Sequence, residues 1–116
     1  MKLKRVYSSI IPFKRYLAMT VFPWVFIREE LRSKYTPTVN RHETTHGLQQ
    51  LETLWLPFFI IYGLEYIIKL PLCCFGFDRA YKSISFEQEA FDNQGKVNYN
   101  NERKHYAWIK YIFKLK

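Results

Sequence analysis

Cysteine and glycine are scarce in this chain of 116 residues. The two cysteines, Cys73 and Cys74, are neighbours in the sequence. They cannot staple distant segments, because a disulfide that stabilises a fold has to close a loop. A disulfide-rich secreted scaffold is therefore excluded, and reduced thiols in a reducing compartment are expected. Four glycines and five prolines also exclude a collagen-like chain.

Long uninterrupted hydrophobic runs are missing as well. The longest apolar stretch, residues 54–68, contains Glu65 and stops at Lys69. It is too short and too charged for a membrane span, so we expect it to belong mainly to the core. Near the start, Lys14 and Arg15 interrupt the apolar residues and no small-residue cleavage motif follows, so no signal peptide is expected. These features predict a cytoplasmic protein, either free or peripheral on the inner face of the membrane.

Aromatic residues, in contrast, are abundant. Ten Phe, nine Tyr and three Trp make up 19% of the sequence. Large rings fill the thin core of a small domain efficiently. The hydrophobic share of 48% and the charged share of 24% are ordinary globular values, so we expect one domain over residues 1–116.

The net charge of +8 is distributed unevenly. Residues 1–41 contain nine basic and two acidic residues, and residues 93–116 contain six and one, whereas residues 42–92 contain three and seven. A nucleic-acid binder is not expected to concentrate its acidic residues in one block, so we expect no nucleic-acid partner. The basic flanks favour an anionic membrane surface, and the acidic middle favours a cation.

Residue patterns predict an α+β fold that is mostly helical. The expected elements are strands within 16–35 and helices over 40–70, 84–94 and 102–116. Pro23 divides the β-branched and aromatic residues of the first range, which predicts a small antiparallel sheet or hairpin. Asn40 is the expected N-cap of the long helix, and Pro57 is expected either to kink it or to divide it into two helices. The last helix is expected to be basic and amphipathic.

The residues that carry chemistry form an H-E-x-x-H motif, His42-Glu43-Thr44-Thr45-His46. Residues four apart share one face of a helix, so both imidazoles can bind one tetrahedral cation such as Zn²⁺. Glu43 lies about 100° around the helix from His42, where it can take a proton from a water molecule. The alternative is a helix start in which Glu43 completes a capping box with Asn40 and the histidines are exposed.

A catalytic zinc site needs a third protein ligand and one open position. His105, the third histidine of the chain, lies far away in the sequence. Glu87 is the better candidate, because it is placed on the expected helix over 84–94 and the small Ala90 follows three residues later. A small residue allows that helix to approach the first one closely.

Together these residues resemble a gluzincin-type zincin metallopeptidase, in which H-E-x-x-H on one helix is joined by E-x-x-A-D on a later helix. The chain is most similar to minimal gluzincin cores, as in membrane-associated endopeptidases related to the CAAX-processing enzymes, and to small uncharacterised bacterial HExxH proteins. The resemblance covers about residues 16–95. It implies a peptide or protein substrate, Glu43 as the general base, and His42, His46 and Glu87 as zinc ligands.

The chain departs from this family pattern at Phe91, where the family usually has Asp, and Asp92 follows one place later. Glu89 is therefore the alternative third ligand, and the acidic partner of a zinc-bound histidine has to come from Asp92 or elsewhere. The resemblance also implies an edge strand on which peptides bind, for which residues 25–28 are the candidate and a core strand is the alternative. The candidate oxyanion donors are Tyr62, Tyr66, Tyr81 and His105.

Two other kinds of protein fit the same sequence. In the first, a fourth internal donor closes the site, and the metal only holds a small non-catalytic fold together. In the second, the chain is a basic membrane-surface or nucleic-acid-binding protein whose motif is fortuitous. Zinc-dependent peptide hydrolysis is the function that the motif and the resemblance favour.

Overall fold

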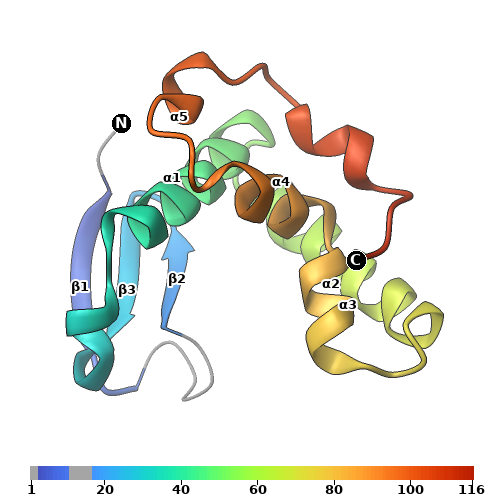
Figure 1. Cartoon of the computed structure of the whole chain (residues 1–116), viewed down its shortest axis with the longest axis horizontal. Helices are drawn as coiled ribbons and strands as arrows, with labels where there is room; N and C mark the ends of the chain where they lie inside the picture. Colours follow the sequence, from blue (N-terminus) through green and yellow to red (C-terminus); the bar gives the residue numbers. More distant parts are fainter. Residues whose placement is uncertain (1–2, 11–16) are drawn as a thin grey trace.

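The computed structural model describes residues 3–10 and 17–116, and its fold is α+β and mostly helical, as the sequence predicts (Figure 1). The strands are β1 (Lys4–Ser8), β2 (Ala18–Val21) and β3 (Trp24–Arg28). The α-helices are α1 (Pro37–Glu52), α2 (Leu56–Leu72), α3 (Phe77–Ser83), α4 (Ser85–Asn93) and α5 (Tyr99–Glu102). Two 3₁₀ helices, η1 (Glu29–Lys34) and η2 (Ala107–Tyr111), complete the order.

The three strands form a mixed sheet with β3 in the centre. β2 pairs with β3 as the expected antiparallel hairpin, and Pro23 lies in the turn between them. β1, which the sequence did not predict, pairs with β3 in parallel, so the sheet as a whole is mixed. β1 lies outside the range 16–35 in which strands were expected. Within the expected strand range 16–35, the last residues form η1 instead of a strand, and residue 16 lies outside the described residues.

Helix α1 begins at Pro37, three residues earlier than expected. Thr36 is its N-cap, and the Thr36 hydroxyl accepts a hydrogen bond from the backbone N–H of Val39 at 3.3 Å. Proline suits the first helical position, because the N–H that it lacks would have no partner there. Asn40 and Glu43 are therefore helix-interior residues, and the predicted capping box between them is wrong.

The range 40–70 is divided into two helices, α1 and α2, bent by 113°, which is one of the two forms that the sequence predicts. The chain turns at residues 53–55, where Leu54 and Trp55 have positive φ angles of 63° and 72°. Those left-handed conformations end α1, and Pro57 belongs to the first turn of α2 instead of a kink. No single helix in the described part of the chain is long and apolar enough to cross a membrane; only the bent α1–α2 pair passes that test, by length and composition.

The C-terminal residues do not form the helix predicted over 102–116. Only the short elements α5 and η2 occur there, and Tyr106 between them has a φ angle of 61°. Of the apolar residues in this segment, Trp108 is buried but Leu115 is exposed. The predicted helix does not form because the Arg103 side chain turns into the interior, where it pairs with the buried carboxylates of Glu52 and Glu89.

Helix α1 lies between two hydrophobic clusters. One cluster contains Val25 and Ile27 of the sheet, and the other contains Phe58, Phe86 and Trp108 of the helical part. Figure 1 shows α1 running from the sheet toward α4, and it contacts both β2 and α4. Its buried residues are nonetheless nearly all polar: His42, Glu43, Thr44, Thr45, His46, Gly47, Gln49 and Gln50. Polar side chains are seldom buried without partners, so the buried face of α1 is the candidate location of a functional site.

Candidate metal centre

Three potential metal ligands converge between α1 and α4. His42 and His46 lie one turn apart on α1, and Glu87 faces them from the first turn of α4. His42 Nε2 is 3.0 Å from Glu87 Oε1, His46 Nε2 is 3.1 Å from Glu87 Oε2, and the two Nε2 atoms are 3.2 Å apart. All three side chains are buried. The structure thus brings together the three residues that the sequence nominates as ligands.

Both histidines are held in the tautomer that a metal requires. Nδ1 of His42 lies 2.9 Å from Gln94 Oε1, and Nδ1 of His46 lies 2.8 Å from Gln49 Oε1. A carboxamide oxygen can only accept, so each Nδ1 carries the hydrogen and each Nε2 keeps a lone pair directed at the group. The two carboxamides take the place of the acidic partner for which Asp92 was one candidate. Asp92 instead pairs with Lys116 at 3.2 Å.

The orientation of Gln49 is itself fixed by two acceptors. Its Nε2 donates to the backbone oxygen of Phe86 at 3.1 Å and to Glu89 Oε1 at 3.0 Å. Because the amide nitrogen is engaged there, the amide oxygen has to face His46. Gln49 follows His46 by three residues on the same helix, whereas nothing in the sequence marked Gln94.

The donor set at this centre fits a divalent cation. Without one, two imidazole lone pairs would face a carboxylate across about 3 Å, so a proton has to take the position instead. Burial lowers the pKa of His46, but the Glu87 carboxylate outweighs burial and raises that pKa to about 9. Burial raises the pKa of Glu87, and the two histidines outweigh it and hold that pKa well below its usual range. Two imidazoles and one carboxylate are ligands that Zn²⁺ prefers.

Glu89, the alternative third ligand, points away from this group. Its two carboxylate oxygens accept hydrogen bonds from Arg103 at 2.7 and 2.9 Å, and Tyr99 donates to it at 2.6 Å. Burial alone would raise the pKa of Glu89, but these donors lower it. Arg103 also binds both oxygens of Glu52, at 3.0 and 3.1 Å. An ionic network therefore lies behind the centre and reaches His46 through Gln49.

Replacing Arg103 by methionine is expected to destabilise the fold by about 3–5 kcal/mol, because Glu52 and Glu89 would remain buried without their common partner. Urea unfolding followed by circular dichroism measures this. The matched control is Lys104→Ala, an exposed neighbour, which we expect to change stability by less than about 0.5 kcal/mol. A loss below about 1 kcal/mol for the Arg103 variant would contradict the network's structural role.

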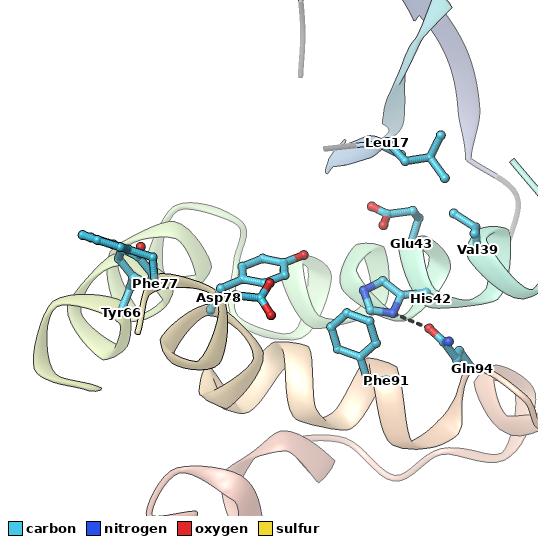
Figure 2. Close-up of a pocket in the computed structure, with 11 residues that line it drawn as sticks. Leu17, Val39, His42, Glu43, Tyr66, Phe77, Asp78, Phe91 and Gln94 are labelled. Carbon is cyan, nitrogen blue, oxygen red and sulfur yellow. Dashed lines mark hydrogen bonds between the residues drawn. The ribbon is translucent and has the colours of Figure 1, made fainter. Parts of the chain in front are cut away.

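Glu43, the predicted general base, lies beside the three-residue group at the wall of a cavity of about 410 Å³ (Figure 2). Thr20 of β2 donates to Glu43 Oε1 at 2.7 Å and orients the carboxylate. A second hollow of about 410 Å³ adjoins on the side of His46 and Glu87, and Glu43 lines both. Sequence patterns gave no indication of Thr20.

The structure separates the four candidate oxyanion donors. Tyr62 donates to Glu87 Oε2 at 2.6 Å, and burial together with that carboxylate raises the pKa of the hydroxyl, so it remains a donor to the ligand. His105 is 88% exposed and lies beside Glu52, away from the centre. Tyr66 and Tyr81 line both hollows. They are the two candidates left facing the cleft.

The strand expected to bind peptides is misplaced. Residues 25–28 belong to β3, which is paired on both sides, so the core-strand alternative applies to them. The edge strand next to the site is β2, and Ala18, Met19 and Thr20 line the cleft. Phe91, the residue at which the chain departs from the family pattern, lies beside the centre. Its ring packs edge-on against His42, with centroids 4.4 Å apart.

Comparisons of the chain with protein-family models, with curated proteins and with solved structures each find no match. The functional argument therefore depends on the centre itself. It consists of a buried His-His-Glu group on two helices, with a carboxylate and tyrosines on the wall of the adjoining cleft.

Proposed function

We propose that the chain is a small zinc-dependent peptidase. The observation that carries the proposal is the convergence of His42, His46 and Glu87 ligand atoms within 4.8 Å of one another. Support comes from the Nδ1 contacts, which direct both Nε2 lone pairs inward, and from Glu43 at the cleft wall. Zinc, when bound, would polarise a carbonyl group and lower the pKa of a water molecule in its open position.

The protein's own residues would move the proton and hold the substrate. Glu43, oriented by Thr20, would take the proton of the attacking water and give it to the nitrogen of the leaving amine. Tyr66 or Tyr81 would donate to the oxygen on which negative charge develops. Tyr62 would keep Glu87 in position as a ligand.

A substrate peptide would lie along the beginning of β2. Further along this strand, Gln50 already occupies the edge: its amide donates to the backbone oxygen of Thr20 at 2.8 Å and accepts from the N–H of Phe22 at 2.6 Å. Strand addition is therefore possible near Ala18, close to Glu43. The rings of Phe58, Phe59 and the tyrosines lining the hollow favour apolar substrate side chains.

The zinc-loaded protein is expected to cleave members of a peptide library that is rich in apolar side chains. Activity should disappear with a strong chelator and return when zinc is added back, because the ligand set has no other way to activate water. Liquid chromatography with mass spectrometry detects the products. Cleavage that persists unchanged in the chelator would contradict the proposal.

The non-catalytic alternative requires a closed site with four protein donors. Within residues 3–10 and 17–116, the group that can hold a metal contains two histidines and one glutamate, and no fourth His, Cys, Asp or Glu. Cys73, a further soft donor, lies near Ser83 in a separate buried cluster. The three-residue group beside a cleft favours the open, catalytic form.

A further inference from the structure

Helix α2 has its charged residues inside and its aliphatic residues outside. Its two charged side chains, Glu65 and Lys69, are buried and form an ion pair at 3.0 Å. The outward residues are instead aliphatic, and each is more than half exposed: Leu56, Ile60, Leu64, Ile67, Ile68 and Leu72. We call these six residues the apolar face of α2. A helix that faces water has the opposite arrangement.

The buried charges have specific partners, which explains why they turn inward. Glu65 accepts hydrogen bonds from the backbone N–H of Ser85, at 3.0 Å, and from the Ser85 hydroxyl, so it caps the start of α4. Lys69 donates to the backbone oxygens of Ser83 and Lys114. The charged groups of α2 therefore all have partners in the interior of the protein. Its other side carries no charged residue along all 17 residues of the helix.

The exposed apolar surface continues beyond both ends of α2. Leu54 and Trp55 are exposed before it, and Phe75 and Phe77 are exposed after it. A soluble monomer seldom exposes so continuous a patch unless something binds there. Trp55 is also of the residue type that concentrates at membrane–water interfaces.

A basic segment contacts α2 near the C-terminal end of that helix. Residues 104–116 contain no acidic residue, and their four lysines are exposed: Lys104, Lys110, Lys114 and Lys116. The contact of Lys69 with the Lys114 backbone places this segment next to α2, and Figure 1 shows the C-terminus beside that helix. Phe113, between two of the lysines, is 97% exposed.

We propose that the apolar face of α2, with the basic residues 104–116 nearby, lies in the interface of an anionic lipid bilayer. The net charge of +8 disfavours a second copy of the chain as the occupant and favours acidic headgroups. With a length of roughly 25 Å, α2 would lie along the surface with its aliphatic residues at the headgroup–acyl boundary. This inference does not depend on the metal centre.

The docked orientation places the cleft close to the bilayer. The inner side of α2 supplies Phe58, Phe59, Tyr62 and Tyr66 to the hollow, whereas the apolar face lies on the opposite side of the same helix. One helix diameter, about 10 Å, would separate the cleft from the headgroups.

Vesicle flotation of the full chain tests the proposal. Vesicles of phosphatidylcholine with about 30% phosphatidylglycerol are strongly anionic, and the protein should float with them at low salt. Vesicles of pure phosphatidylcholine should retain at least about fivefold less, and high salt should weaken anionic binding. Equal retention by both lipids, or no retention by either, would overturn the proposal.

Two matched variants locate the binding surface. Ile60→Gln/Ile67→Gln should lower the vesicle partition coefficient by about tenfold or more, because two side chains no longer enter the apolar boundary. The control Val97→Gln changes a residue that is 73% exposed but lies in the α4–α5 turn, and it should bind as the wild type does. Zinc content should be unchanged in all these variants, so a failure here leaves the metal site untouched. Unaltered binding of the double variant would show that the α2 face is the wrong surface.

Tryptophan emission gives an independent readout. Vesicle binding should shift the emission to the blue, and that shift should be lost in Trp55→Phe but retained in Trp24→Phe, a comparably exposed residue on β3. A shift that depends on Trp24 alone would overturn the orientation. A stable dimer in lipid-free buffer that the Ile60→Gln/Ile67→Gln variant dissociates would assign the face to a second copy and overturn the proposal.

Discussion

Replacing His46 by alanine is expected to reduce the zinc content of the purified, zinc-equilibrated protein from about one ion per chain to less than about a tenth of an ion. His46 supplies one of the three ligand atoms, and its loss leaves a buried imidazole and a carboxylate that cannot complete the coordination. His42→Ala should have the same effect. Glu87→Gln should weaken zinc binding while preserving the shape of the side chain.

His105→Ala is the matched control, because it removes the third histidine of the chain from a position that is 88% exposed and beside Glu52. It should keep about one zinc per chain. Circular dichroism of each variant separates loss of metal from loss of fold. Unchanged zinc content in folded His42→Ala and His46→Ala would remove the metal-site interpretation.

The second large effect concerns Glu43, which we treat as a base and not as a ligand. Glu43→Gln should retain zinc and fold, since a glutamine oxygen can still accept from Thr20. Peptide cleavage should fall by about two to four orders of magnitude, the usual contribution of a positioned general base. Steady-state assays at equal zinc loading measure it.

Thr20→Val distinguishes orientation from base chemistry. It removes the hydroxyl that orients the carboxylate and leaves the base in place, so cleavage should fall by less than in Glu43→Gln. Full activity in the glutamine variant would contradict the mechanism.

Local patterns predicted the parts of the structure that depend on short-range physics. The H-E-x-x-H spacing placed His42 and His46 on one helix face, and the carboxylate at Glu87 met them because α4 crosses α1 there. The hairpin of β2 and β3 followed from β-branched residues around Pro23. The histidine pair and the hairpin depend on residues that are close in the sequence, whereas Glu87 was singled out by its spacing to Ala90 and by the family resemblance.

The remaining features depend on partners far away in the sequence. Arg103 leaves the predicted C-terminal helix because Glu52 and Glu89 are 51 and 14 residues away from it in the sequence and hold it by charge. The parallel pairing of β1 and the contact of Gln94 with His42 are equally long-range. A single sequence carries no local signal for such pairs.

The outward turn of the aliphatic residues of α2 was also missed. Its apolar run was predicted to be mainly core. Phe58 is buried and Ile61 packs against the core, but with Glu65 turned inward to cap α4 the six residues of the apolar face point outward. Hydrophobicity alone could not separate the two sides of this helix.

X-ray absorption at the zinc edge tests the central claim most directly, because it reports the ligands of the bound ion. We predict two imidazole nitrogens at about 2.0–2.1 Å, with oxygen ligands at a similar distance. One imidazole should disappear in any residual signal of His42→Ala. A sulfur ligand at about 2.3 Å, which only a cysteine or a methionine could supply, or a wild-type spectrum without imidazole, would contradict the His42–His46–Glu87 centre.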